Sequence, residues 1–271
     1  MRPNRVAAMI DDGETVVNAW LSSNSSYLAE VLSHAGFDAV TVDLQHGMMG
    51  IDGAIALLQG ISVGPATPMA RCSHLDQAEI AKLLDAGAYG VICPSIDTVE
   101  QCIAFVAACR YPPRGRRSFG PARGLLYGGP DYAGEADTTV QAWAMIESAA
   151  ALDALEEIVA VAGLDGVYVG PNDLALSLGV TAGTDPLAPE VQEALATVVS
   201  VAHRAGVAAG AYCATAEQAA TLTRIGYDLV TPGNDAVLIR ESATRRIRTV
   251  RGFGAADAGV VDGAQEHHGG Y

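Results

Sequence analysis

Short apolar runs alternate with segments of helical periodicity along most of the chain. Each run has the length of a buried strand, and the alternation is typical of βαβ units in a parallel sheet. Eight strand–helix pairs indicate a closed (β/α)8 barrel, the TIM barrel of the α/β class, rather than an open sheet. The predicted strands are Val16–Leu21, Asp38–Asp43, Thr67–Arg71, Gly90–Pro94, Ala144–Glu147, Gly166–Val169, Ala208–Tyr212 and Leu229–Thr231.

Several of the predicted helices end in a glycine just before the next strand. Gly36, Gly87, Gly206 and Gly226 hold these positions. Glycine takes the left-handed conformation that ends a helix without a steric clash, so the repetition supports the alternation. The predicted helices are Tyr27–His34, Ile51–Leu58, Gln77–Asp85, Val99–Ala108, Ala150–Val161, Pro189–Ala205, Ala216–Arg224 and Ala236–Val250.

Length and composition favour one domain. The chain has 271 residues, half of them hydrophobic, and a single barrel usually takes about 250 residues. We assign residues 1–252 to the barrel domain. Residues 253–271 are small, polar and rich in glycine, which indicates a flexible tail that is disordered or wraps a neighbouring subunit. His267 and His268 in this tail are expected to be passive rather than metal ligands.

The acidic charge narrows the class of partner. A net charge of -15 and a pI near 4.6 disfavour nucleic acid and anionic membranes, because phosphate contacts need lysine or arginine. No run approaches the roughly 18 apolar residues of a membrane span, and the first residues do not resemble a secretory signal. The five cysteines form no C-x-x-C pair, which predicts buried, reduced thiols. We expect a cytoplasmic protein that binds a small molecule.

Two carboxylates follow buried strands. Glu147 ends the run Ala144–Glu147, and Asp173 follows the strand Gly166–Val169 after a tight turn. The carboxyl ends of parallel strands converge on one face of a barrel, where barrel enzymes hold their active sites. Hard oxygen ligands of this kind suit Mg, Mn or a similar divalent ion. The pair therefore predicts a metal site and an enzyme.

Asp43, His46 and Arg71 follow the second and third strands and are predicted to lie on the same face. A histidine beside a carboxylate gains orientation and basicity, which suits a general base near neutral pH. In the alternative reading Asp43 caps the next helix and His46 is a loop residue, and the sequence alone does not separate the two. Arg71 is either a structural partner of Asp43 or Glu147, or a clamp for a carboxylate or enolate, and we favour the clamp.

The turn after the sixth strand has the sequence Gly170-Pro171-Asn172-Asp173-Leu174. Such a turn points backbone N–H groups outward, and together with the helix dipole they form a pocket for a carboxylate or phosphate. Asp173 is an N-cap in the alternative reading, which its pairing with Glu147 disfavours.

The only lysine excludes one kind of aldolase. An aldolase that works through a Schiff base needs a desolvated lysine in the mouth of the barrel. Lys82 lies inside a predicted helix. Any carbonyl activation should therefore fall to the metal.

Several motifs occur together in an order and spacing that are specific. They are Trp20-Leu21-Ser22-Ser23, Gly36-Phe37-Asp38, Asp43-x-x-His46-Gly47, Arg71, Arg110-Tyr111-Pro112-Pro113, Ile146-Glu147, Gly166 to Leu174, and Pro232-Gly233-Asn234-Asp235. With them the chain resembles the HpcH/HpaI aldolase/citrate lyase family, over the range 16–251. Its metal-dependent class II pyruvate aldolases include 4-hydroxy-2-oxoheptanedioate aldolase and 2-dehydro-3-deoxyglucarate aldolase.

The resemblance implies a reversible cleavage of a 4-hydroxy-2-oxo acid to pyruvate and an aldehyde through a metal-stabilised pyruvate enolate. Glu147 and Asp173 would hold Mg, Mn or Co, and pyruvate would chelate that ion through its keto oxygen and carboxylate. Backbone N–H groups at Asn172 and Asp173 would hold the carboxylate. The substrate-binding residues that the resemblance implies are Trp20, Arg71, Gly170, Pro171, Asn172 and Asp173.

The resemblance also implies catalytic roles. Arg71 would stabilise the enolate oxygen, and His46 with Asp43 would transfer protons through a metal-bound water. Two positions depart from the common pattern of the family: Met145 replaces a frequent glutamine, and Gln45 replaces a frequent glutamate. The loss of an amide beside the metal removes one possible hydrogen bond to the oxo acid, which affects the substrate rather than the fold.

Two other functions are compatible with this fold. The same scaffold hosts acyl-CoA lyases of the citrate and malate type, and a non-catalytic barrel could retain the fold.

We expect a homo-oligomer, a trimer or hexamer. The long connection from Arg110 to Val140 holds five of the fifteen arginines and is predicted to be a lid or an interface segment. It should meet the acidic surface of a neighbouring subunit or, alternatively, a carboxylate on the acceptor aldehyde.

Overall fold

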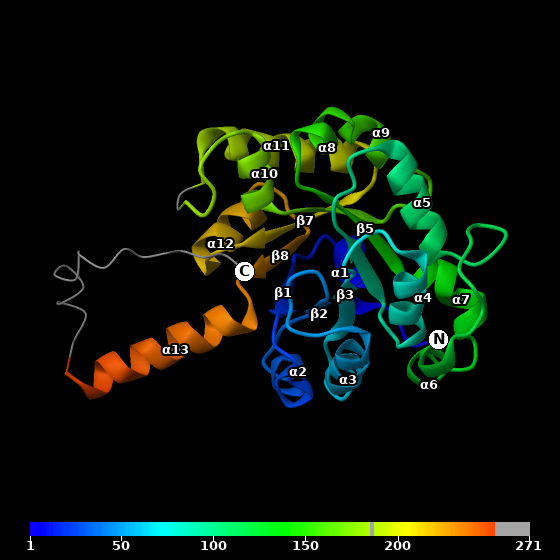
Figure 1. The fold of residues 1–271 in the computed structure, drawn as a ribbon, viewed down its shortest axis with the longest axis horizontal. Coiled ribbons are helices and arrows are strands. Elements are labelled where there is room, and N and C mark those ends of the chain that lie inside the picture. The colour runs from blue at the N-terminus through cyan, green and yellow to red at the C-terminus, as the bar shows by residue number, and fades with distance from the viewer. Residues whose placement is uncertain (185–186, 253–271) are drawn as a thin grey trace.

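The protein folds into a closed barrel of eight parallel strands surrounded by helices (Figure 1). The structure, a computed structural model, describes residues 1–184 and 187–252. Strands pair in chain order and the last pairs with the first, which confirms the predicted (β/α)8 barrel. The strands are β1 (Val16–Leu21), β2 (Ala39–Asp43), β3 (Thr67–Arg71), β4 (Gly90–Cys93), β5 (Gln141–Ile146), β6 (Gly166–Val169), β7 (Ala208–Cys213) and β8 (Leu229–Pro232).

The strand register brings the polar strand ends to one end of the barrel. Asp43 of β2 pairs with Arg71 of β3. Ile146 of β5 pairs with Val169 of β6, so Glu147 lies one residue beyond its strand rather than inside it. Because all eight strands run in the same direction, these residues share the carboxyl end of the barrel.

Large apolar side chains fill the interior of the barrel. Met69, Trp143 and Tyr168 belong to a buried cluster that also includes Val6 of helix α1 (Arg5–Asp11). This helix, which the sequence analysis did not predict, closes the amino end of the barrel. All five cysteines are free and buried, as predicted.

The outer helices match most of the predicted positions. The segment predicted as one helix, Ala150–Val161, is two short helices that meet at Ala154. The helix after β6 was predicted only as a helix start. The helices are α2 (Ser26–Ser33), α3 (Ile51–Ile61), α4 (Gln77–Asp85), α5 (Val99–Cys109), α6 (Ala122–Gly128), α7 (Tyr132–Thr139), α8 (Ala149–Asp153), α9 (Leu155–Val159), α10 (Pro171–Ser177), α11 (Pro189–Arg204), α12 (Ala216–Arg224) and α13 (Asp235–Val250).

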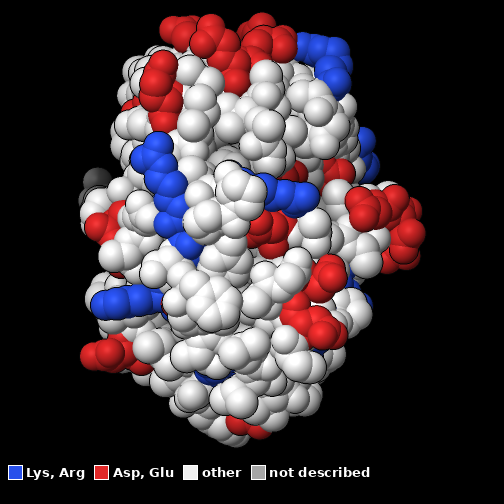
Figure 2. Space-filling model, turned by 90° about the vertical axis from the view of Figure 1, so that its right-hand side faces the viewer, with Lys and Arg blue, Asp and Glu red and all other residues white. Residues whose placement is uncertain are grey.

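The long connection between α5 and β5 contains helices α6 and α7, and three of its five arginines bind groups within the chain. Arg110 forms an ion pair with Asp165 at 2.5 Å, and the buried Arg117 pairs with Asp85 at 2.8 Å. Arg123 donates to the carbonyl oxygen of Ala86. The internal contacts of Arg110, Arg117 and Arg123 argue against a role for these three side chains at a neighbouring subunit or a substrate, whereas for the exposed Arg114 and Arg116 that contact stays a prediction. Figure 2 shows blue Lys and Arg side chains exposed on the face with α4 to α7.

Helix α13 projects away from the barrel (Figure 1), and Asp235 at its start is its only buried residue. Among the described residues, no helix is long and apolar enough to cross a membrane. The predicted flexible tail, residues 253–271, lies outside the part of the chain that the structure describes.

Candidate active site

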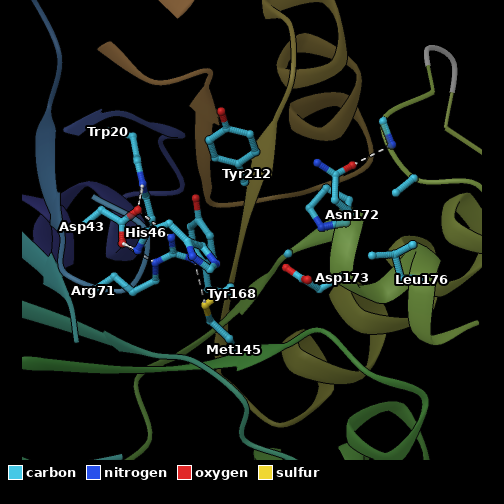
Figure 3. A pocket seen from close by; sticks show the side chains of 14 residues that line it. Trp20, Asp43, His46, Arg71, Met145, Tyr168, Asn172, Asp173, Leu176 and Tyr212 are labelled. Carbon is cyan, nitrogen blue, oxygen red and sulfur yellow. Dashed lines mark hydrogen bonds and ion pairs between the residues drawn. The ribbon is translucent and has the colours of Figure 1, made fainter. Parts of the chain in front are cut away.

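A cavity of about 430 Å³ lies at the carboxyl end of the barrel (Figure 3). It brings together strand-end side chains from six strands and the first turn of α10. Every predicted site residue lines it except Glu147, which lies beside it. The lining residues are Trp20, Asp43, His46, Arg71, Met145, Tyr168, Gly170, Pro171, Asn172, Asp173, Leu176, Ala182, Gly183 and Tyr212.

Arg71 and Asp43 form a buried ion pair with two contacts. Nε of Arg71 donates to Oδ1 of Asp43 at 2.8 Å, and Nη2 donates to Oδ2 at 2.6 Å. The indole N–H of Trp20 also donates to Oδ2, at 3.1 Å. The third guanidinium nitrogen, Nη1, contacts Sδ of Met145 at 4.0 Å, so one edge of the guanidinium has no acidic partner among the described residues. The sequence left open whether Arg71 is a partner of Asp43 or a clamp, and the geometry allows both.

Asp43 is held as an anion. Burial alone would raise the pKa of its carboxyl, but the hydrogen bonds and charge of Arg71, with help from Trp20 and the backbone N–H of His46, hold that pKa below 3.8. The backbone N–H groups of Gln45 and His46 donate to Oδ1 at 3.0 and 3.3 Å. A carboxylate with these partners is a weak base, so it is better suited to position Arg71 than to accept a proton.

Glu147 is held by a serine in an unusual backbone conformation. Ser95, just after β4, has a φ of 55°, a left-handed value that costs a non-glycine residue on the order of 1–3 kcal/mol. Its backbone N–H donates to Oε1 of Glu147 at 2.7 Å, and its hydroxyl lies 3.4 Å from the same oxygen. Burial, and to a smaller extent the charge of Asp173, raise the pKa of Glu147 above 4.5 despite these hydrogen bonds.

The turn after β6 brings Asp173 close to Glu147. A Cβ added at Gly170 would lie 2.9 Å from Oε2 of Glu147 and 3.1 Å from Cε of Met145, so a side chain there would displace the glutamate. Gly170 is the N-cap of α10, and Asp173 lies in the first turn, so the alternative that Asp173 is the N-cap is wrong. The carboxylate of Asp173 makes no hydrogen bond or ion pair with any described residue.

Glu147 and Asp173 fit a divalent cation. Their negative charges repel, which adds to the larger effect of burial in raising the pKa of Glu147, and a cation between them would offset that repulsion. No group of three or more His, Cys, Asp or Glu side chains suited to a metal occurs in the described ranges. Magnesium-like ions commonly use one or two protein carboxylates and fill their other positions with water or substrate oxygens. The donor set therefore suits an ion that also binds a substrate.

Several residues of the site were not predicted from the sequence. Ser95 and Tyr212 stand at the ends of β4 and β7, where the strand-end argument could have found them. Leu176 and Ala182 come from α10 and the loop after it, and no sequence signal marks them. Lys82 lies in α4 and does not line the cavity, as predicted.

Comparison with known proteins gives a consistent result. The family model described as HpcH/HpaI aldolase/citrate lyase matches residues 17–242. A hydroxypyruvate/pyruvate aldolase from Rhizorhabdus wittichii is 38% identical over 92% of this chain and 99% of its own length. A 4-hydroxy-2-oxo-heptane-1,7-dioate aldolase from Klebsiella pneumoniae is 35% identical over 85% of this chain and 88% of its own. A solved HpcH/HpaI aldolase/citrate lyase family protein from Burkholderia cenocepacia superimposes with a TM-score of 0.85 at 30% identity, covering 92% of this chain and 99% of that one.

Proposed function

This chain belongs to the HpcH/HpaI aldolase/citrate lyase family, and we propose that the cavity at the carboxyl end of its barrel is where the chemistry of that family takes place. The protein is a carbon–carbon lyase, an aldolase that cleaves a 2-oxo acid to pyruvate and an aldehyde. Aldolases of this family depend on a divalent metal. The substrate in our proposal is a 4-hydroxy-2-oxo acid, and the reaction is reversible.

Glu147 and Asp173 hold the metal in this proposal, with Mg, Mn and Co as candidates. Ser95 fixes Oε1 of Glu147, and the absence of a side chain at Gly170 leaves space beside Oε2. When bound, a divalent cation would polarise the 2-oxo group and stabilise the negative charge of the enolate. Backbone N–H groups of Asn172 and Asp173 would hold the carboxylate of pyruvate.

Arg71 and His46 act on the reacting atoms. Asp43 and the Trp20 indole keep the guanidinium of Arg71 in place, and its Nη1 edge donates to the enolate oxygen, where charge develops. His46 lines the same cavity, takes a proton from the methyl group of pyruvate and returns it to the aldehyde oxygen once the new bond has formed. Asp43 is thus a positioning residue, while Arg71 and His46 are catalytic residues.

This proposal rests on one observation. A single cavity holds a fixed arginine, and two carboxylates suited to a metal lie close to that arginine. The direct test is pyruvate release from a 4-hydroxy-2-oxo acid, followed with lactate dehydrogenase, after chelation and after addition of Mg, Mn or Co. We expect activity only with added metal. Cleavage of an acyl-CoA substrate without release of pyruvate would favour the acyl-CoA lyase, and no turnover of either substrate would favour the non-catalytic barrel.

We also propose that the protein is a homo-oligomer, a trimer or hexamer. Helix α13 projects from the barrel with Ile239 and Ile247 exposed, and Val17 of β1 is 37% exposed although it belongs to a barrel strand. A second copy of the chain would cover such apolar side chains. Sedimentation velocity of the native protein and of Ile247→Glu would test this, with dissociation expected in the variant.

The cytoplasmic location stays a prediction that cell fractionation would test.

A further inference from the structure

We propose that the acceptor half of this cavity binds an uncharged aldehyde, and that the hydroxyl of Tyr212 donates a hydrogen bond to the aldehyde oxygen. The inference rests on the proposed function and names the class of the second substrate at the same site. Two features of the cavity support this inference. They are the distribution of charge and the one tyrosine hydroxyl in the cavity that lacks a protein partner among the described residues.

The charges in the cavity disfavour an acidic aldehyde. Among the described lining residues, Arg71 is the only lysine or arginine. Two of its nitrogens bind Asp43, and the third serves the enolate oxygen in the mechanism above. The lining acids are Asp43 and Asp173, with Glu147 beside them. In the metal-loaded enzyme Arg71 would pair with Asp43, and the metal with Glu147, Asp173 and pyruvate, so a carboxylate on the aldehyde would lose water without a free lysine or arginine among the described lining residues to pair with it.

The wall on the side of Tyr212 is uncharged. Figure 3 shows Tyr212 between the group formed by Trp20 and Arg71 and the turn that carries Asn172. The ring of Trp20 packs edge-on against Tyr212, with the centroids 6.1 Å apart and the planes at 77°, which fixes the orientation of the tyrosine. Leu176 adds apolar surface to the same cavity.

The loop after α10 completes this wall. The side-chain oxygen of Asn172 accepts a hydrogen bond from the backbone N–H of Gly183 at 2.9 Å. That bond holds Ala182 and Gly183 at the cavity, where both contribute only small side chains or backbone. Among the described residues, the acceptor therefore meets a neutral surface that suits an aliphatic or hydroxylated chain.

The hydroxyl of Tyr212 is available as a donor. It makes no hydrogen bond with any described residue, whereas the hydroxyl of the neighbouring Tyr168 is bound to Oγ1 of Thr231 at 2.8 Å. Burial raises the pKa of Tyr212 to about 12, so its hydroxyl keeps its proton throughout the neutral range. A donor without a partner among the described residues, on a half-buried side chain that lines the cavity, suits a substrate oxygen.

The donor has a defined task in bond formation. The enolate carbon supplies the electron pair of the new carbon–carbon bond, and the π pair of the aldehyde carbonyl moves to its oxygen. His46 then gives that oxygen the proton that it took from pyruvate. Tyr212 transfers no proton, and its hydrogen bond becomes stronger as negative charge grows on the oxygen.

The first test compares two acceptors of equal length. Butyraldehyde and succinic semialdehyde differ only in a terminal methyl group against a terminal carboxylate. With the Mg-loaded enzyme and pyruvate, we expect kcat/KM to be at least about tenfold higher for butyraldehyde. Equal values, or a preference for succinic semialdehyde, would overturn the proposed acceptor class and would indicate a cation from outside the described residues.

The second test compares Tyr212→Phe with Tyr27→Phe, a control at a side chain that is 76% exposed on α2. Tyr212→Phe should lower kcat/KM for butyraldehyde by about tenfold and leave deuterium exchange into the methyl group of pyruvate unchanged. The control should change neither. Unchanged acceptor kinetics in Tyr212→Phe, or an equal loss of exchange, would overturn the role of Tyr212. Absence of exchange in the native enzyme would instead overturn the proposed function, and this inference with it.

Discussion

Replacement of Asp43 by asparagine tests the ion pair on which the position of Arg71 depends. Asp43 is 1% exposed and Arg71 is 7% exposed, and they meet at 2.6 and 2.8 Å. Removal of one partner from such a pair usually costs about 3–5 kcal/mol, because the other charge stays buried without a partner. For a domain of this size that loss lowers Tm by roughly 6–20 °C. Thermal unfolding followed by circular dichroism measures it.

A matched control is Glu156→Gln in the ion pair of Glu156 with Arg204. That pair has a similar length, 2.7 Å, but its side chains are 72% and 58% exposed, so the change should cost no more than about 0.5 kcal/mol. The pKa of Asp43 lies below its usual 3.8 in the folded protein. The stabilisation of the folded state by the ionised carboxyl is therefore fully present above pH 3.8 and is lost only as the pH falls through the folded pKa. The Tm difference should therefore be constant from about pH 8 to pH 5. A loss in Asp43→Asn as small as in the control would refute the reasoning.

The remaining predictions concern the enolate and the metal. Arg71→Ala should lower kcat/KM by about a hundredfold or more, roughly 3 kcal/mol, and Arg71→Lys should restore only part of it because one ammonium cannot keep both contacts to Asp43. Gly170→Ala should weaken Mn binding by about tenfold, since the added Cβ would displace Glu147. A titration followed by electron paramagnetic resonance measures this affinity, and an unchanged value would contradict the site geometry. The pKa of Glu147 is raised above its usual 4.5, so the metal-free folded protein should lose stability as the pH rises from 4.5 through this raised pKa. Over the same pH range the affinity for Mn should rise, because Glu147 becomes ionised. Affinity that does not change with pH there would show that Glu147 is not a ligand.

The barrel could be predicted because its strands are buried on both faces, so each reads as a short apolar run. The errors fall where that signal is weak. Strand β5 begins at Gln141, three residues before the predicted start at Ala144, and a polar residue at a strand start breaks the apolar run. Helices α6 and α7 were missed because Pro121, Gly128 and Gly129 surround or end them and resemble loop residues.

The site could be predicted in part, because residues at the ends of parallel strands must converge. The convergence of the strand ends correctly predicted that Asp43, Arg71 and Glu147 lie at one end of the barrel. The partner of each side chain could not be predicted, since it depends on loop conformation. Ser95 acts through its backbone N–H at a φ of 55°, and neither a backbone donor nor a backbone angle is visible in the identity of the residue. The arginines between α5 and β5 gave a partly misleading charge signal, because Asp165 and Asp85, the acidic partners of Arg110 and Arg117, lie far away in the sequence.

Deuterium exchange into the methyl group of pyruvate, without any aldehyde, tests most directly the claim that this cavity forms a metal-dependent enolate. In D₂O the Mg-loaded enzyme should raise the mass of pyruvate, as measured by mass spectrometry, and chelation should stop the exchange until Mg is returned. Glu147→Gln should fold, as judged by circular dichroism, and exchange no deuterium. Exchange that persists after exhaustive chelation, or that proceeds at the full rate in Glu147→Gln, would contradict the account.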